Sequence, residues 1–235
     1  MKRLIILFLC SSTIYAQQIK VTQDFGIWGG VSLKKSVFSK YTLTFEHQFR
    51  TFHNSSKIDD YLFDTRLEYS INKHFFLSAN LRYTHDIKRV DETENNFRYN
   101  FDIGYKKKFN PKITLRYRFR YQQEFVNPYP HADVGESTDP GYIFLFKNRQ
   151  NKTHSSSSRN KLKLNYKYSN KYNLYASFEI FRLRELFRQP YFNKLRFFIG
   201  NNLSRVDLAL GFEKELNSDY PYSFLFVKSI YKIKK

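Results

Sequence analysis

The 235-residue chain carries 40 lysine and arginine residues against 21 aspartate and glutamate residues, a formal net charge of +19, and 19% of its residues are aromatic. Such a composition is found both in nucleic-acid-binding proteins and in proteins that face anionic lipid. The one cysteine, Cys10, lies close to the start. The rest of the chain therefore has neither disulfides nor thiolate metal sites.

The first 16 residues have the composition of a secretory signal peptide. Lys2 and Arg3 form a basic start, residues 4–10 are a short apolar run, and small residues lead to Ala16. The apolar run is far shorter than the roughly 20 residues that a helix needs to cross a bilayer. We therefore expect cleavage after Ala16 and export of residues 17–235 as one domain, which argues against nucleic acid as a partner.

Alternation of apolar and polar residues dominates the rest of the chain. It is clearest at 112–122 (KITLRYRFRYQ), where aliphatic and aromatic residues occupy one parity and Arg116, Arg118 and Arg120 the other. A strand sends these two sets to opposite faces of a sheet, whereas a helix would scatter the arginines around its axis. The last segment is blurred, with apolar residues on both parities. Strands are predicted, in chain order, at 24–34, 41–50, 61–71, 75–84, 97–106, 112–122, 161–168, 172–180, 195–203, 206–212 and 222–233.

These segments, each with an apolar and a charged face, predict an all-β fold that closes on itself with its apolar side toward lipid. A polar lumen also explains the low mean hydropathy of −0.61. Antiparallel closure requires an even number of strands, so we expect a single antiparallel up-and-down transmembrane β-barrel of about 12 strands. Residues 17–23 are the candidate for the additional strand.

Connection lengths predict the orientation. Short turns at 72–73, 107–111, 169–171 and 201–205 are expected on the periplasmic side, and longer breaks outside. The C-terminus then lies in the periplasm, and the first clear strand starts outside. The longest break, 126–158, contains three prolines and a run of four serines, and the sequence assigns it no role.

Several short sequence motifs follow one another along the chain. They are DFGIW at 24–28, RTF at 50–52, DYLFD at 60–64, LRY at 81–83, YRFRYQ at 117–122 and RNKL at 159–162. Over nearly the whole mature chain, they resemble the uncharacterised outer-membrane β-barrel family called domain-of-unknown-function family 2490. The resemblance implies an outer-membrane barrel and transfers no catalytic residues. The chain departs from barrels of this kind at its end, KIKK at 232–235, where an aromatic residue is usual.

The polar parity of the strands carries many basic residues and several carboxylates, which a closed barrel would point inward. A barrel of about 12 strands has an interior that side chains can nearly fill. Two interpretations stay open: an ion-pair network that plugs the lumen, and a cation-lined passage that favours anions. The expected lumen-lining residues are Arg50, Arg66, Glu68, Arg82, Arg98, Asp102, Arg116, Arg118, Arg120, Lys161, Lys163 and Arg196.

One segment, His154-Ser155-Ser156 with Asn160 close by, offers a catalytic alternative. His154 and Ser156 share the parity of the lipid-facing Leu162, and they resemble the His-x-Ser pair of outer-membrane phospholipases, in which histidine activates serine. A solvated loop is the simpler interpretation, so we expect no enzyme, with a rim-located lipid hydrolase as the alternative. No histidine spacing predicts a metal site and no glycine-rich phosphate loop occurs, so we expect neither metal nor cofactor.

The outward tyrosines predict a girdle at the membrane interface rather than a sugar-binding surface. His47 and His85, also at outward positions, are expected to be interfacial residues and not ligands. We expect a monomer in the outer membrane of a Gram-negative-type bacterium. Its partners would be the lipid bilayer, anionic outer-leaflet lipids and the barrel-assembly machinery, without nucleic acid. Its function would be that of a structural barrel or a narrow, anion-favouring pore.

Overall fold

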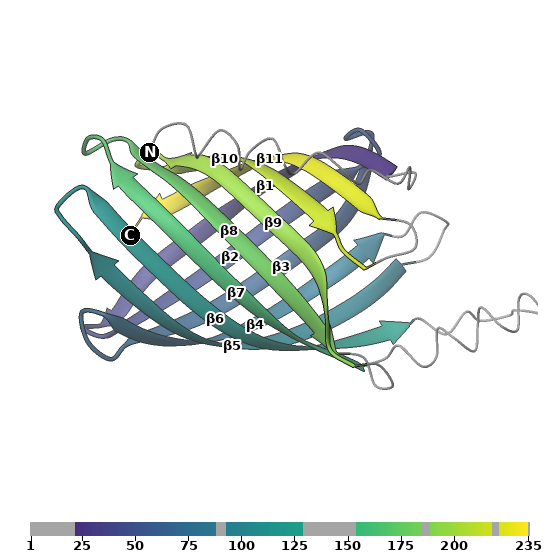
Figure 1. The fold of residues 1–235 in the computed structure, drawn as a ribbon, viewed down its shortest axis with the longest axis horizontal. Coiled ribbons are helices and arrows are strands. Elements are labelled where there is room, and N and C mark those ends of the chain that lie inside the picture. Colours follow the sequence, from purple (N-terminus) through teal and green to yellow (C-terminus); the bar gives the residue numbers. More distant parts are fainter. Residues whose placement is uncertain (1–21, 88–92, 129–153, 185–188, 218–220, 235) are drawn as a thin grey trace, which may run out of the picture.

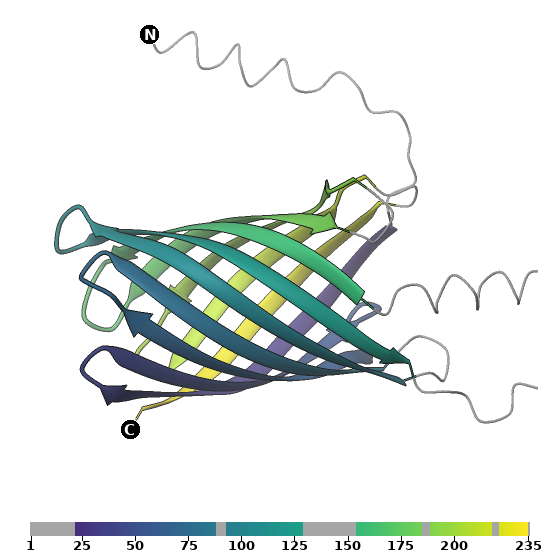
Figure 2. The same cartoon turned by 90° about the horizontal axis from the view of Figure 1, so that it is seen from below.

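The computed structural model describes residues 22–87, 93–128, 154–184, 189–217 and 221–234. Within these residues the chain forms eleven strands that wind into one closed barrel (Figures 1 and 2). The strands are β1 (Thr22–Phe38), β2 (Tyr41–Phe52), β3 (Lys57–Ser70), β4 (Phe75–Ile87), β5 (Thr93–Lys108), β6 (Ile113–Pro128), β7 (His154–Lys167), β8 (Asn173–Arg184), β9 (Tyr191–Asn202), β10 (Val206–Glu215) and β11 (Tyr222–Lys234). The all-β barrel class expected from alternation is confirmed.

The barrel closes between its first and last described strands. β1 pairs with β11 in parallel, from Thr22 opposite Tyr222 to Lys34 opposite Lys234, while every other neighbouring pair is antiparallel and consecutive in sequence. In a meander each turn reverses the direction of the chain, so an odd number of strands brings the first and last into the same direction. The expected number of about 12 strands is corrected to eleven in the described residues, and fully antiparallel closure was wrong.

The two faces of the sheet differ as the alternation predicts. Leu81 and Ile103, on the outer face, are 66% and 59% exposed, whereas Asn80 and Asn100, on the inner face, are 2% and 1% exposed. Exposed large apolar side chains occupy the outward-facing positions of all eleven described strands, as expected of a barrel in a membrane. Among the described residues, no helix is long and apolar enough to cross a membrane.

The five connections at one end of the barrel are short, and a side chain of the turn caps the backbone at three of them. At one turn, the Asn72 side-chain oxygen accepts hydrogen bonds from the backbone N–H groups of His74 and Phe75, both at 2.8 Å. At the next, the Asn110 oxygen accepts from the N–H of Ile113 at 2.7 Å. These Asx contacts stabilise the tight turns at which the chain reverses direction. We call this end, where β11 stops, the short-turn end (Figure 2).

The connections at the other end, the long-loop end, are shorter than expected because the strands extend further. β6 continues to Pro128 and β7 begins at His154, so the expected break at 126–158 is corrected. Its serine run, 155–158, belongs to β7. Residues 129–153, which include the apolar segment 142–146, lie outside the described residues.

Candidate functional site in the barrel lumen

All twelve predicted lumen-lining residues lie on the inner face, in two groups. One group forms ion pairs in the middle and toward the long-loop end: Arg50, Arg82, Arg98, Asp102, Arg120 and Arg196. The other group lines a cavity near the short-turn end: Arg66, Glu68, Arg116, Arg118, Lys161 and Lys163. Adjacent strands supply members of each group, because every second residue of a strand faces inward.

Asp102 of β5 anchors the middle of the lumen. Arg120 of β6 stands directly opposite in the register and donates from Nε at 2.5 Å and from Nη2 at 2.8 Å to its two carboxylate oxygens. Ser78 donates a further hydrogen bond at 2.9 Å, and Arg118 lies 3.7 Å away. Because Asp102 and Arg120 are each only 2% exposed, this bidentate pair fills space that water would otherwise occupy.

Glu179 of β8 is the second anchor. Its carboxylate, with no exposed surface, forms ion pairs with Arg159 and Lys161 of β7, and Arg196 of β9 approaches to 4.0 Å. Arg159 was not among the predicted lumen residues, although it shares the parity of Lys161. The predicted break at 126–158 ended directly before it, so it was not counted with a strand.

Further pairs join these anchors into what we call the ion-pair belt. Arg82 binds Asp64 through Nε at 2.9 Å and Nη2 at 2.7 Å, and Arg98 contacts Glu124. Arg120 lies opposite Arg159 in the β6–β7 register, which makes the belt continuous. The belt comprises Asp64, Arg82, Arg98, Asp102, Arg120, Glu124, Arg159 and Glu179. Its carboxylates offset most of the positive charge in the middle of the lumen.

An aromatic cluster lies beside the belt, and sequence reasoning missed it. Trp28 of β1 stacks on Phe226 of β11 with 3.8 Å between ring centroids, and Phe198 and Phe224 pack against Phe226 edge-on and stacked, respectively. Arg50 stands 4.2 Å over the Trp28 ring. The blurred parity of the last strand was the available signal, because its second apolar set points into the lumen.

Glycine makes room for this cluster. A Cβ atom on Gly211 of β10 would lie 2.3 Å from two ring carbons of Phe226. A similar close approach occurs at Gly104 of β5, where a Cβ would lie 1.9 Å from the ring of Phe76. The tip of each ring thus occupies the space that a side chain at the neighbouring glycine would need, so only a residue without a side chain fits there.

Two cavities flank the belt. The cavity toward the long-loop end has a volume of about 340 Å³. Its charged lining is balanced, with three basic residues against three carboxylates. These are Arg50, Lys194 and Arg196 against Asp59, Glu213 and Glu215. Trp28 and Phe224 of the aromatic cluster complete part of its wall.

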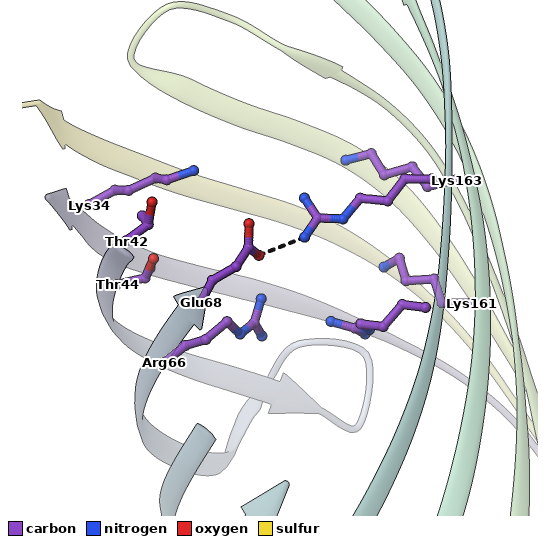
Figure 3. Close-up of a pocket in the computed structure, with 9 residues that line it drawn as sticks. Lys34, Thr42, Thr44, Arg66, Glu68, Lys161 and Lys163 are labelled. Carbon is purple, nitrogen blue, oxygen red and sulfur yellow. Dashed lines mark hydrogen bonds and ion pairs between the residues drawn. The ribbon is translucent and has the colours of Figure 1, made fainter. Parts of the chain in front are cut away.

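The cavity toward the short-turn end, which we call the cationic chamber, has a volume of about 270 Å³. Figure 3 shows Lys34, Thr42, Thr44, Arg66 and Glu68 on one wall, facing Lys161 and Lys163 across it. Arg116 and Arg118 of β6 complete the lining, and Arg116 donates to Glu68 at 2.6 Å. Six basic residues therefore surround one carboxylate. The chamber differs from the other cavity in net charge rather than in size.

The described neighbours of Ser156 offer no carboxylate that could complete a catalytic site with His154. Ser156 lies in β7 with the outward parity, half-buried, opposite Gln123 of β6 and Arg184 of β8. Neither neighbour can orient a histidine as a carboxylate does. The side chain of His154 lies outside the described residues. Asn160 lies four residues after Ser156 on the same face of β7, and its side-chain oxygen accepts a hydrogen bond from the Tyr117 hydroxyl at 2.6 Å.

The outward histidines have aromatic and amide neighbours. The ring of His47 lies 4.4 Å from that of Phe63, and His85 Nδ1 lies 2.9 Å from the side-chain oxygen of Asn95. In the part of the chain that the structure describes, no three His, Cys, Asp or Glu residues are grouped to hold a metal ion.

Comparison with known proteins gives one match. No curated protein and no solved structure matches the chain. The family model described as "Protein of unknown function (DUF2490)" matches residues 25–207, which span β1 to the start of β10 and include the belt and the chamber. Since the match covers well over half of the 235 residues, the chain belongs to the DUF2490 family.

Proposed function

We propose that this protein is an outer-membrane β-barrel that forms a narrow, anion-favouring passage of low conductance. The cationic chamber is the observation that carries the proposal. Its six basic residues and one carboxylate create a positive potential inside a low-dielectric wall, where charges are poorly screened. A small anion entering from the short-turn end would be stabilised there, and a cation repelled.

The belt makes the passage narrow. Arg120 and Glu179 are among the largest fully buried side chains of the protein, and Glu179 contacts both Lys161 of the chamber and Arg196 of the other cavity. An ion that crosses the lumen must pass between side chains held by bidentate ion pairs. We therefore infer a low conductance that depends on displacement of belt side chains, in contrast to a wide water-filled porin channel.

The surface and the N-terminal sequence support the proposed location. Apolar side chains such as Leu81 and Ile103 cover the outside, which suits hydrocarbon. The signal-like residues 1–16 support export. A bacterial outer membrane, reached with the help of the barrel-assembly machinery, is the location that combines both features, and a monomer suffices because the sheet has no free edge.

Planar-bilayer recording tests the proposal. Purified protein in a potassium chloride gradient should give small currents whose reversal potential has the sign of chloride preference. Arg66→Glu, in the chamber, should move the reversal potential toward zero, whereas Lys214→Glu, exposed near the opposite rim, should leave it nearly unchanged. Absence of current in either direction would overturn the passage and leave a structural barrel.

A further inference from the structure

Within the described part of the chain, three of the six cations of the chamber, Lys34, Arg66 and Lys163, lack the acidic partner that each belt cation has, whereas the other three contact Glu68, Asp102 or Glu179. Among the described residues, no carboxylate lies within ion-pair distance of Lys34, Arg66 or Lys163, and the Nε atoms of Arg66 and Arg118 are buried without a hydrogen-bond partner. The one acid of the lining, Glu68, is already bound by Arg116. Half of the chamber's cations are thus not neutralised by a carboxylate of the described residues, at a cost in like-charge repulsion.

These donors converge from opposite walls. Lys34, Thr44 and Arg66 come from β1, β2 and β3, and Lys161 and Lys163 reach toward them from β7 (Figure 3). A ligand that satisfies both walls must carry acceptor oxygens on more than one side. The volume of about 270 Å³ lies just below the roughly 300–1,000 Å³ of ordinary small-molecule sites, so the ligand must be small.

The mouth next to the chamber is basic as well. Each of the five short turns carries one exposed lysine or arginine and no carboxylate. These residues are Lys40, Lys73, Lys112, Lys171 and Arg205. A ring of one sign at a mouth raises the local concentration of oppositely charged solutes and speeds their entry.

We propose that the cationic chamber is a binding site for a small phosphate-bearing polyanion, of the pyrophosphate or tripolyphosphate class, entered from the short-turn end. The site lies in the passage proposed above, and the inference rests on that lumen being reached from this end. Arginine forks match phosphate oxygens bidentately, and the Thr42 and Thr44 hydroxyls add neutral donors. The lining has six positive charges and one negative, and it stays net positive although Arg118 and Lys161 also contact Asp102 and Glu179, which favours a multivalent ligand over chloride or a single carboxylate.

Isothermal titration of the mature chain, folded in phosphatidylcholine nanodiscs, tests the site with sodium tripolyphosphate as the probe. We expect saturable binding that weakens as salt rises, and far weaker binding of nitrate. Arg66→Gln and Lys163→Gln should each lower the affinity about tenfold, since each removes a charge-assisted hydrogen bond. Neither substitution breaks an ion pair with a described residue, and heat-modifiable migration on gels verifies that the variants fold.

Lys194→Gln is the control for lumenal charge, because it removes a positive charge from the other cavity, where Lys194 is paired with Glu213. It should bind tripolyphosphate as the unmodified chain does. Absence of saturable binding, or an Arg66→Gln variant that binds as tightly as the unmodified chain, would overturn the site. Binding without current would refute the passage alone, and anion-selective current without binding would refute the site alone.

The phosphate chemistry has two sources, a free anion and a lipid headgroup, and a second titration separates them. Phosphatidylglycerol nanodiscs replace phosphatidylcholine. Competition from the lipid that is lost in Lys163→Gln identifies the headgroup as the occupant. If phosphatidylglycerol changes the tripolyphosphate affinity of the unmodified protein and of Lys163→Gln by the same factor, the lipid acts through the surface potential alone. That result identifies the free anion as the occupant.

Discussion

Trp28 and Phe226 lie face to face inside the barrel, with 3.8 Å between ring centroids and 18° between ring planes. They come from β1 and β11, the two strands that pair in parallel to close the barrel. The closure is therefore secured twice, by backbone hydrogen bonds in the sheet wall and by an apolar contact in the lumen. Arg50 covers the free face of the indole and joins this contact to the charged lining.

Phe226→Ala should destabilise the barrel by about 3–5 kcal/mol, because it leaves a cavity between Trp28 and Gly211. Trp28 is the one tryptophan of the chain, so its fluorescence reports unfolding by guanidinium from lipid vesicles directly. Phe109→Ala, an exposed phenylalanine in a short turn, serves as the control and should change little. Equal stabilities of the two variants would contradict the role assigned to the cluster.

The assignment of the faces predicts opposite responses to a carboxylate. Leu81→Asp, in the middle of β4 on the outside, should cost about 2 kcal/mol of folding free energy in lipid. Thr44→Asp, in the chamber, should cost little, because Lys34 and Arg66 stand opposite it in the register. Folding yields into vesicles over a urea series measure both. A larger loss at Thr44 would mean that the faces are reversed.

Glu179→Gln should cost about 3–5 kcal/mol, because it leaves Arg159 and Lys161 buried without their carboxylate. Glu215→Gln, at a half-buried position in the second cavity, is the matched control and should cost less than 1 kcal/mol, roughly the worth of an exposed pair. Thermal unfolding in detergent, followed by circular dichroism, compares the two. If the belt is also the barrier to conduction, Glu179→Gln should raise the single-channel current.

We expect no phospholipase activity from this chain. Release of fatty acid from mixed micelles should be at background level, and Ser156→Ala should leave it there, because the neighbours Gln123 and Arg184 supply no carboxylate to a histidine. A detectable activity that Ser156→Ala abolishes would establish the hydrolase instead.

The alternation of residues was sufficient to predict the strands and their faces. Arg116, Arg118 and Arg120 face inward as the pattern at 112–122 indicated, because parity is a local property of the chain. Pairs directly across two neighbouring strands, such as Asp102 with Arg120, follow once the register is known. Such pairs are within reach of sequence reasoning.

Contacts across the lumen could not be predicted from the sequence. Arg116 of β6 binds Glu68 of β3, and two strands separate them in the wall. That pairing depends on the tilt and stagger of the whole barrel, which no local pattern contains. The stack of Trp28 on Phe226 is of the same kind, because it depends on which strands meet at the closure. The odd number of strands escaped prediction for that reason too.

The parallel pairing of β1 with β11 also decides where the two ends of the barrel emerge. Thr22 opens β1 at the long-loop end, and Lys234 closes β11 at the short-turn end. An epitope fused ahead of β1 and another fused behind β11 would consequently be accessible to antibodies from different compartments. In a barrel with an even number of strands, both tags would lie on the same side of the membrane. Antibody access to the two tags in intact cells therefore distinguishes the eleven-stranded barrel from an even-stranded one.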